Sequence, residues 1–198
     1  MGPDAEWRNL HNQNTQERYA MANLHGTWNI DPVHSTLSFV VRHAMVTKVR
    51  GSFTDWNATV TVDGDDLAQS RAEASIKVAS VDTRMTDRDE HLRSADFFDA
   101  EQFPEATFTS TAADIDAEGN GTVTGDLTIK DVTKPVTLKV ETLGVAEDPS
   151  GETRWGFEAS TTIDRTEFGI DFNAPMNSGG LLLSKDIKVE IEGSATRA

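Results

Sequence analysis

Chemically active side chains are concentrated between Thr86 and Phe98, in the segment TDRDEHLRSADFF. Asp87 and His91 are four residues apart and would share one face of a helix, where they could hold a metal ion or exchange a proton. Imidazole-containing metal sites usually recruit several ligands, and the other histidines of the patterned region, His34 and His43, lie on opposite parities of a different segment. The segment therefore indicates a short capped helix rather than a metal centre.

Nucleophilic catalysis has weak support. Asp31, His34 and Ser35 are close in sequence, but not in the strand-turn-helix context of a nucleophile elbow. The chain has no P-loop, no glycine-rich dinucleotide fingerprint, no HExxH sequence and no cysteine. We therefore expect a protein that is not an enzyme and that requires neither a metal nor another cofactor.

The charge limits the partners further. A formal charge of −15, without clustered lysine and arginine, disfavours nucleic acid and electrostatic docking on an anionic membrane. No segment approaches the roughly 20 apolar residues of a membrane helix, so we expect no stable membrane insertion. Residues 1–24 are polar and lack the features of a secretory signal. They predict a mobile extension before a single domain over 25–198, in the cytoplasm, or in the periplasm or outside the cell if a signal was removed.

Alternating apolar and polar residues dominate the chain from Trp28 onward and predict about eight strands. Phe53 has the opposite parity to Trp56, which predicts a bulge or bend near Asp55. Most connections are short, which favours an all-β antiparallel sandwich or barrel, and a closed barrel leaves no exposed edges. The patterned segments cover residues 34–43, 50–62, 71–80, 105–114, 121–130, 134–141, 155–164 and 186–193.

A helical insertion is predicted at about 86–103, between two of these strands. Thr86 or Asp87 would cap its first turn, and its acidic residues would favour the helix N-terminus and face water. Phe97 and Phe98 would face the barrel, so the insertion could cover one barrel end. Farther along, adjacent Asp164 and Arg165 predict a buried or half-buried ion pair at a strand end.

Inward-facing positions mix small residues with aromatic ones. The small ones, which leave room, are Ala72, Ala74, Gly125 and Ala159. The aromatic ones, which provide apolar walls, are Phe39, Phe108, Trp155 and Phe157. Eight strands enclose enough space either for packed side chains or for one ligand. The pattern alone supports a solid core and a cavity equally.

Five segments in order resemble the YceI family: WNIDPVHSTLSFVVRH, RGSFTDW, SVDTRMTDRDEHLRSADFFDAEQFPEATFTST, GDLTIKDVTKPVTL and IDRTEFGI. The resemblance extends from Trp28 to about Gly193, and the run RDEHLRSADFFD followed by FPEATF is its most specific part. It implies an eight-stranded lipocalin-like antiparallel β-barrel whose interior takes a polyisoprenoid or a similar long amphiphile. It also suggests a homodimer.

The resemblance implies the binding and carriage of a long-chain amphiphilic lipid, most simply a polyisoprenoid such as a polyprenyl chain or an isoprenoid quinone. The apolar tail would lie inside the barrel and the polar head near its mouth. The walls would be Phe39, Val41, Phe108, Leu127, Trp155 and Phe157. Phe97, Phe98, Phe168 and Phe172 would shape the entrances, and His34, His43, Arg88 or His91 would contact the head group.

Two other functions fit the same sequence. The barrel could be an enzyme that acts on a lipid or quinone, with His34, His43 or His91 as general acid or base. Alternatively, it could be a stress-linked structural protein with an incidental apolar interior. A lipid that co-purifies with the chain would favour the binding function over the structural one.

Overall fold

The computed structural model describes residues 24–63, 67–116, 118–177 and 179–198. The extension predicted over 1–24 thus lies outside the described residues, except for Leu24. That residue is 1% exposed, and its carbonyl accepts a 2.7 Å hydrogen bond from the indole Nε1 of Trp28. Leu24 therefore belongs to the folded domain, whose predicted start at residue 25 is one residue late.

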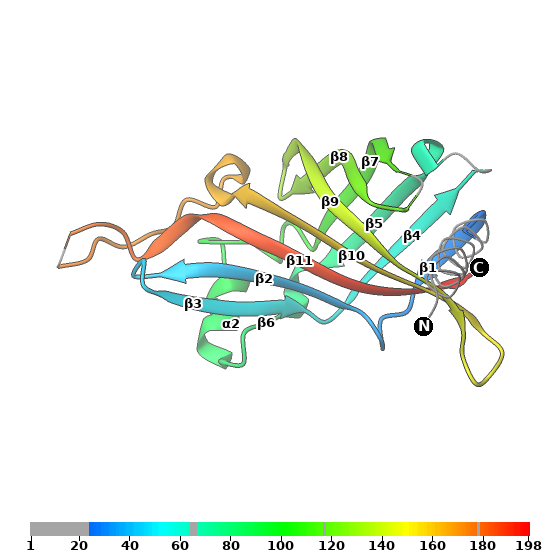
Figure 1. The fold of residues 1–198 in the computed structure, drawn as a ribbon. Coiled ribbons are helices and arrows are strands. Elements are labelled where there is room, and N and C mark those ends of the chain that lie inside the picture. Colours follow the sequence, from blue (N-terminus) through cyan, green and yellow to red (C-terminus); the bar gives the residue numbers. More distant parts are fainter. Residues whose placement is uncertain (1–23, 64–66, 117, 178) are drawn as a thin grey trace, which may run out of the picture.

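Strands make up most of the described chain (Figure 1). Within the described residues, one α-helix, α2, and three 3₁₀ helices, η1 to η3, connect or follow them. The strands are β1 Gly26–Ile30, β2 Thr36–His43, β3 Thr47–Phe53, β4 Trp56–Val62, β5 Arg71–Lys77, β6 Val81–Asp82, β7 Glu105–Ile115, β8 Gly121–Ile129, β9 Val132–Glu147, β10 Thr153–Asp164 and β11 Leu183–Arg197. The helices are η1 Leu67–Gln69, η2 Val78–Ser80, α2 Thr86–Arg93 and η3 Arg165–Phe168.

These strand segments form one closed antiparallel barrel, because β1 pairs with both β4 and β11. Three of the barrel's eight strands are interrupted, and each is divided into two segments. β1 and β2 follow one another along β11, β3 and β4 run back beside them, and β5 is followed by β6. β7 to β11 are unbroken. The predicted eight-stranded all-β barrel is thus confirmed, with strand β1 added ahead of the predicted segments.

The break between β3 and β4 explains the parity of Phe53. The bend predicted near Asp55 is present: the chain bends at Thr54 and Asp55, and this bend divides the segment 50–62 between β3 and β4. Phe53 pairs with Val81, whereas Trp56 pairs with Ile76. Because the turn resets the alternation, Phe53 and Trp56 both face the interior.

Helix α2 lies beside the barrel and connects β6 to β7 (Figure 1). Its N-cap is Met85, with no side-chain cap bond, so the predicted caps Thr86 and Asp87 are wrong. Not all of its acids face water either. Asp89 is buried and accepts hydrogen bonds from the backbone amide of Thr83 at 2.8 Å and its hydroxyl at 2.5 Å. This buried carboxylate ties the first turn of the helix to the end of β6.

Arg165 does not form the predicted ion pair with Asp164. The Asp164 carboxylate instead accepts from the amide and hydroxyl of Thr166, which lowers its pKa. Arg165 is 5% exposed and donates to three backbone carbonyls: Nε to Ser184 at 3.0 Å, and Nη1 to Ile170 at 2.5 Å and Phe172 at 2.9 Å. Burial lowers the pKa of the guanidinium. Arg165 therefore holds the segment after η3 against the start of β11.

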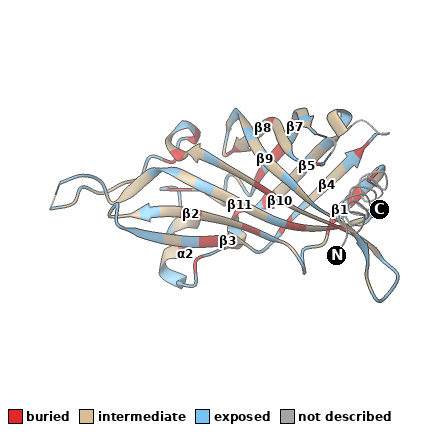
Figure 2. Ribbon diagram, viewed as in Figure 1, coloured by how far each residue is buried: buried red, intermediate tan, exposed pale blue. Residues whose placement is uncertain are grey.

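A cluster of buried apolar residues, here called the tryptophan cluster, lies at the barrel end where β1 meets the last residues of β11. Trp28 and Trp155 meet edge to face there, with ring centroids 5.8 Å apart. Buried residues concentrate along this end and along the inner faces of the central strands, whereas the connections are mostly exposed (Figure 2). The cluster comprises Leu24, Trp28, Val62, Trp155 and Ala195.

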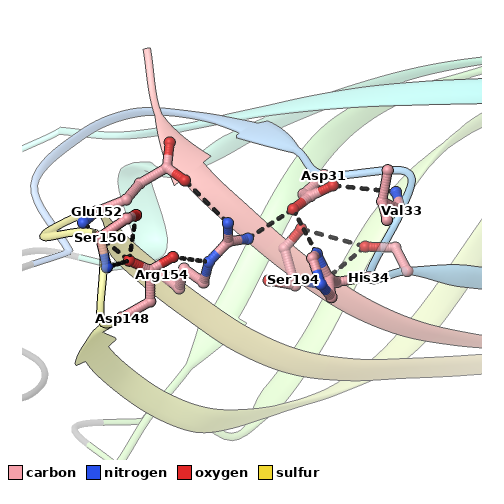
Figure 3. Close-up of polar contacts among 9 residues, drawn as sticks. Asp31, Val33, His34, Asp148, Ser150, Glu152, Arg154 and Ser194 are labelled. Atoms are coloured by element: carbon pink, nitrogen blue, oxygen red, sulfur yellow. Dashed lines mark hydrogen bonds and ion pairs between the residues drawn. The ribbon is translucent and has the colours of Figure 1, made fainter.

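An arginine clamp joins two connections at this same end (Figure 3). Arg154 donates to Asp31 at 2.5 Å, to Asp148 at 2.8 Å and to Glu152 at 2.9 Å. Asp31 also bonds His34 Nδ1 at 2.8 Å. His34 and Arg154 together lower the pKa of Asp31 to about 2, and the carboxylates raise the pKa of Arg154. The clamp fastens the β9–β10 connection to the β1–β2 connection.

Candidate ligand-binding cavity

An apolar cavity of about 710 Å³ occupies the barrel interior. Its size falls within the ~300–1,000 Å³ range typical of small-molecule sites. It extends from the tryptophan cluster toward α2 and the start of β11. Its strand walls include Leu37, Phe39, Val41, Trp56, Ala74, Phe108, Val123, Leu127, Val136, Leu138, Val140, Trp155, Phe157, Ile163, Val189 and Ile191. Of the two interiors that the sequence allowed, a solid core and a cavity, the structure has the cavity.

Strand alternation positions these walls. The inward residues of β10 run in steps of two from Trp155 to Ile163, and those of β2 from Leu37 to His43. All six predicted wall residues line the cavity: Phe39, Val41, Phe108, Leu127, Trp155 and Phe157. The predicted register of their strands is therefore correct, and ligand contact by these side chains stays a prediction.

Three of the wall phenylalanines lie against a glycine of the adjoining strand. Phe157 is directly opposite Gly193, and a Cβ at 193 would come within 2.6 Å of its ring carbon Cε1. Real side chains do not approach so closely, so glycine lets the ring lie against the wall rather than project into the lumen. Phe39 lies over Gly51, and Phe108 lies over Gly125, in the same way. These glycines help to keep the barrel hollow.

Polar side chains reach the cavity near α2. His91 lines it and packs edge-on against Phe97 and Phe172, with ring centroids 5.0 and 4.8 Å away. Its Nε2 lies 2.8 Å from Asp96 Oδ2. Arg88 also lines the cavity and donates to the hydroxyl and carbonyl of Thr83 at 2.7 and 2.8 Å. The α2 side of the cavity therefore carries polar side chains. Ser70, Arg71, Glu73, Glu141 and Thr142 add polar groups to the lining near β5 and β9, and the remaining strand positions are mostly apolar.

The remaining predicted site residues divide into two groups. Phe97, Phe98, Phe172 and His43 line the cavity, as do Arg88 and His91. His34 and Phe168 do not. The turn after Asp31 directs His34 outward into the arginine clamp, at the tryptophan end (Figure 3). Phe168 is in η3, where strand alternation does not apply, and is buried in the core. Both placements correct the prediction.

Sequence reasoning missed Leu182 and Leu183, which also line the cavity. They belong to the segment MNSGGLLLS, whose two glycines are typical of a flexible loop leading into the last strand. The signal was the run of three leucines, which is unusual for a solvated loop. The contacts between wall glycines and phenylalanines were missed as well, although Gly125 is among the small inward residues predicted from sequence. These contacts depend on which residues pair across strands, and that pairing is invisible along a single chain.

Metal-ligating side chains do not gather anywhere in the described part of the chain: it holds no group of three or more histidine and acidic residues placed to bind one ion. The absence of a metal requirement stays a prediction. Among these same residues, no helix is long and apolar enough to cross a bilayer.

Comparison with known proteins agrees with this architecture. The model of the YceI-like domain matches residues 28–195. A UPF0312 protein of Staphylococcus epidermidis is 40% identical over 164 residues, which cover 82% of this chain and 93% of that protein. Two solved structures also match. BcnA of Burkholderia cenocepacia has 28% identity and a TM-score of 0.71, and the match covers 84% of this chain and 99% of BcnA. A polyisoprenoid binding domain from Saccharophagus degradans has 15% identity and a TM-score of 0.61, and the match covers 86% of this chain and 98% of that domain. The chain therefore belongs to the family of proteins with a YceI-like domain.

Proposed function

We propose that this barrel binds and carries one long-chain amphiphilic lipid, a polyprenyl chain or an isoprenoid quinone. The observation that carries the proposal is the continuous apolar cavity of about 710 Å³ along the barrel. A chain-like apolar ligand matches such a space better than a compact polar substrate, because almost every lining position on the strands presents hydrocarbon.

The energetics favour retention of such a ligand. Burial of each methylene group contributes about 0.8 kcal/mol. Immobilising a flexible chain offsets part of this gain. Several isoprene units would still leave a net favourable free energy, since each contributes several carbon atoms.

The geometry supports an orientation for the ligand. The tryptophan cluster closes one end of the cavity with hydrocarbon and aromatic rings. The polar side chains Arg88 and His91 lie at the α2 side. We therefore place the tail toward Trp155 and the polar head near α2, with His43 as a further contact for the head.

The comparisons support the ligand class. The Saccharophagus degradans domain, described as polyisoprenoid binding, has the same fold. Binding is favoured over catalysis at the α2 side because two polar groups there, His91 and Arg88, are engaged in structural contacts. His91 bonds Asp96 and packs between two rings, and Arg88 is bonded to Thr83.

Native mass spectrometry of gently purified protein tests the proposal. Wild-type chain should carry the mass of one apolar ligand. Ala74→Trp, which places an indole in the lumen, should show the mass of the protein without a ligand. Ser75→Trp is the matched control, because it lies next along β5 and outside the cavity lining, and should retain the ligand. Protein that is empty in all three forms, while folded, would contradict the proposal.

A further inference from the structure

Two connections meet at the barrel end opposite the tryptophan cluster. The β2–β3 turn and the segment before β11 are joined by the amide of Ala44, which donates to the carbonyl of Leu182 at 2.7 Å, and by pairing of His43 with Leu183. In Figure 1 both project beyond the rest of the barrel. Figure 2 shows this projecting end as largely exposed.

Three apolar side chains are exposed at this end. Val46 is 82% exposed, and Met45 and Leu181 are also exposed. We name these three residues the apolar tip. Scattered single apolar residues on a surface are ordinary, but these three lie on two adjoining connections at one end of the molecule. The tip adjoins the interior, because the neighbouring residues Leu182, Leu183 and His43 line the cavity.

The backbone of the turn makes this composition more unusual. Val46 donates its amide to the carbonyl of His43, and the two central residues, Ala44 and Met45, have φ of 50° and 60°. Turns with two such residues ordinarily use asparagine and glycine. The backbone conformation of this turn is therefore unfavourable for its two central residues, and the turn still exposes a methionine and a valine. Backbone strain of this kind is found at functional sites, which fits a binding surface here.

Charge around the tip differs from that of the whole chain. The segments 42–48 and 181–186 carry Arg42, Lys48 and Lys185 against one carboxylate, Asp186, in a chain of formal charge −15. The net charge disfavours an anionic membrane for the molecule as a whole, but this end is locally cationic. A locally cationic rim around exposed apolar side chains is complementary to a bilayer with anionic lipids.

We propose that the apolar tip docks on the surface of an anionic lipid bilayer and presents the cavity to it, so that a lipid can pass between bilayer and barrel. This inference rests on the proposed lipid carriage for its purpose, but the docking itself does not require a bound lipid. Met45, Val46 and Leu181 would enter the interface, while Arg42, Lys48 and Lys185 face the head groups.

Vesicle flotation tests the docking, with vesicles of phosphatidylcholine alone and of phosphatidylcholine mixed with phosphatidylglycerol. Wild-type protein should float with the mixed vesicles, more weakly with the neutral ones, and less in high salt. Val46→Asp should weaken binding about tenfold or more, because a charge replaces a buried apolar side chain. Val33→Asp is the matched control: Val33 is equally exposed, at 82%, but is in the β1–β2 connection at the other end. It should bind like wild type.

Docking is contradicted if wild-type protein floats with neither kind of vesicle, or if the two aspartate variants bind vesicles equally well. It is also contradicted if wild-type protein is a dimer that binds no vesicles and that Val46→Asp converts to a monomer. The last result would assign the tip to a second copy of this chain. Lipid extracted from each purified variant separates the two proposals. If the purified protein retains lipid but its flotation does not depend on Val46, docking is rejected and carriage stands. If flotation depends on Val46 but the purified protein carries no lipid, carriage is rejected and docking stands.

Discussion

Phe157 on β10 lies against Gly193, its direct partner on β11, and a side chain at 193 would overlap the phenyl ring. The pair explains how an aromatic residue can point into the barrel without filling it. The ring spreads over the neighbouring backbone and covers it, while the centre of the barrel stays open. The cavity thus depends on glycine positions as much as on the small inward residues.

Gly193→Ala should force the Phe157 ring toward the lumen. We expect a loss of about 1–3 kcal/mol in the free energy of unfolding, as for other overpacked sites, together with reduced lipid content. Gly156→Ala is the control, because a Cβ there would meet Leu143 at an ordinary 3.5 Å. Denaturant unfolding and lipid extraction check both variants. Equal behaviour of the two would show that the ring does not depend on Gly193.

Phe157→Ala probes the same wall from the other side. A phenylalanine packed on all sides typically costs about 3–5 kcal/mol on truncation. Phe157 borders an open cavity, so its loss should cost less than that and should change the amount of lipid retained. Unfolding midpoints and extracted lipid measure the two effects. Unchanged stability with unchanged lipid would place the residue away from the ligand.

Arg165→Gln should be among the most destabilising substitutions of a polar residue. It would leave the carbonyls of Ser184, Ile170 and Phe172 without their donor, and each orphaned buried group costs about 1–3 kcal/mol. Arg165→Lys should not restore stability, because one ammonium lacks the fork geometry of the guanidinium. Chemical denaturation of the three proteins provides the measurement. Full rescue by lysine would mean that charge alone is required.

The arginine clamp should make stability fall in acid. The pKa of Asp31 is about 2 in the folded chain, below the ordinary value of about 3.9 that an unfolded chain has. Its contribution is therefore present above about pH 4 and is lost as the pH falls through about 2. Asp31→Asn should lower the melting temperature at neutral pH by a few degrees, and the gap from wild type should narrow in acid. A gap that is constant from neutral to acid pH would show that the clamp does not titrate in this way.

The strand pattern was readable from sequence because alternation records which face of each strand is buried. It correctly predicted the walls formed by β2, β8 and β10. It failed where the chain turns or changes conformation. His34 follows an Asp-Pro turn and Phe168 is in a 3₁₀ helix, and neither lines the cavity, because strand alternation does not extend through these segments. At Phe53, by contrast, the change of parity correctly indicated a bend near Asp55.

Contacts between distant segments could not be predicted in the same way. Asp164 and Arg165 look like an ion pair because they are adjacent, yet Arg165 bonds carbonyls that only the folded chain brings to it. The pairing of Phe157 with Gly193 likewise depends on the register between β10 and β11. Local patterns report faces and turns, whereas partners across the barrel require the register of each strand pair.

A crystal structure of the protein loaded with its co-purified or added polyprenyl lipid would show directly whether the barrel interior binds the lipid. We expect continuous ligand density inside the barrel, with the tail toward Trp155, the head near Arg88 and His91, and the Phe157 ring still against Gly193. Ligand bound only on the outer surface, with the interior collapsed or filled by side chains, would contradict this expectation.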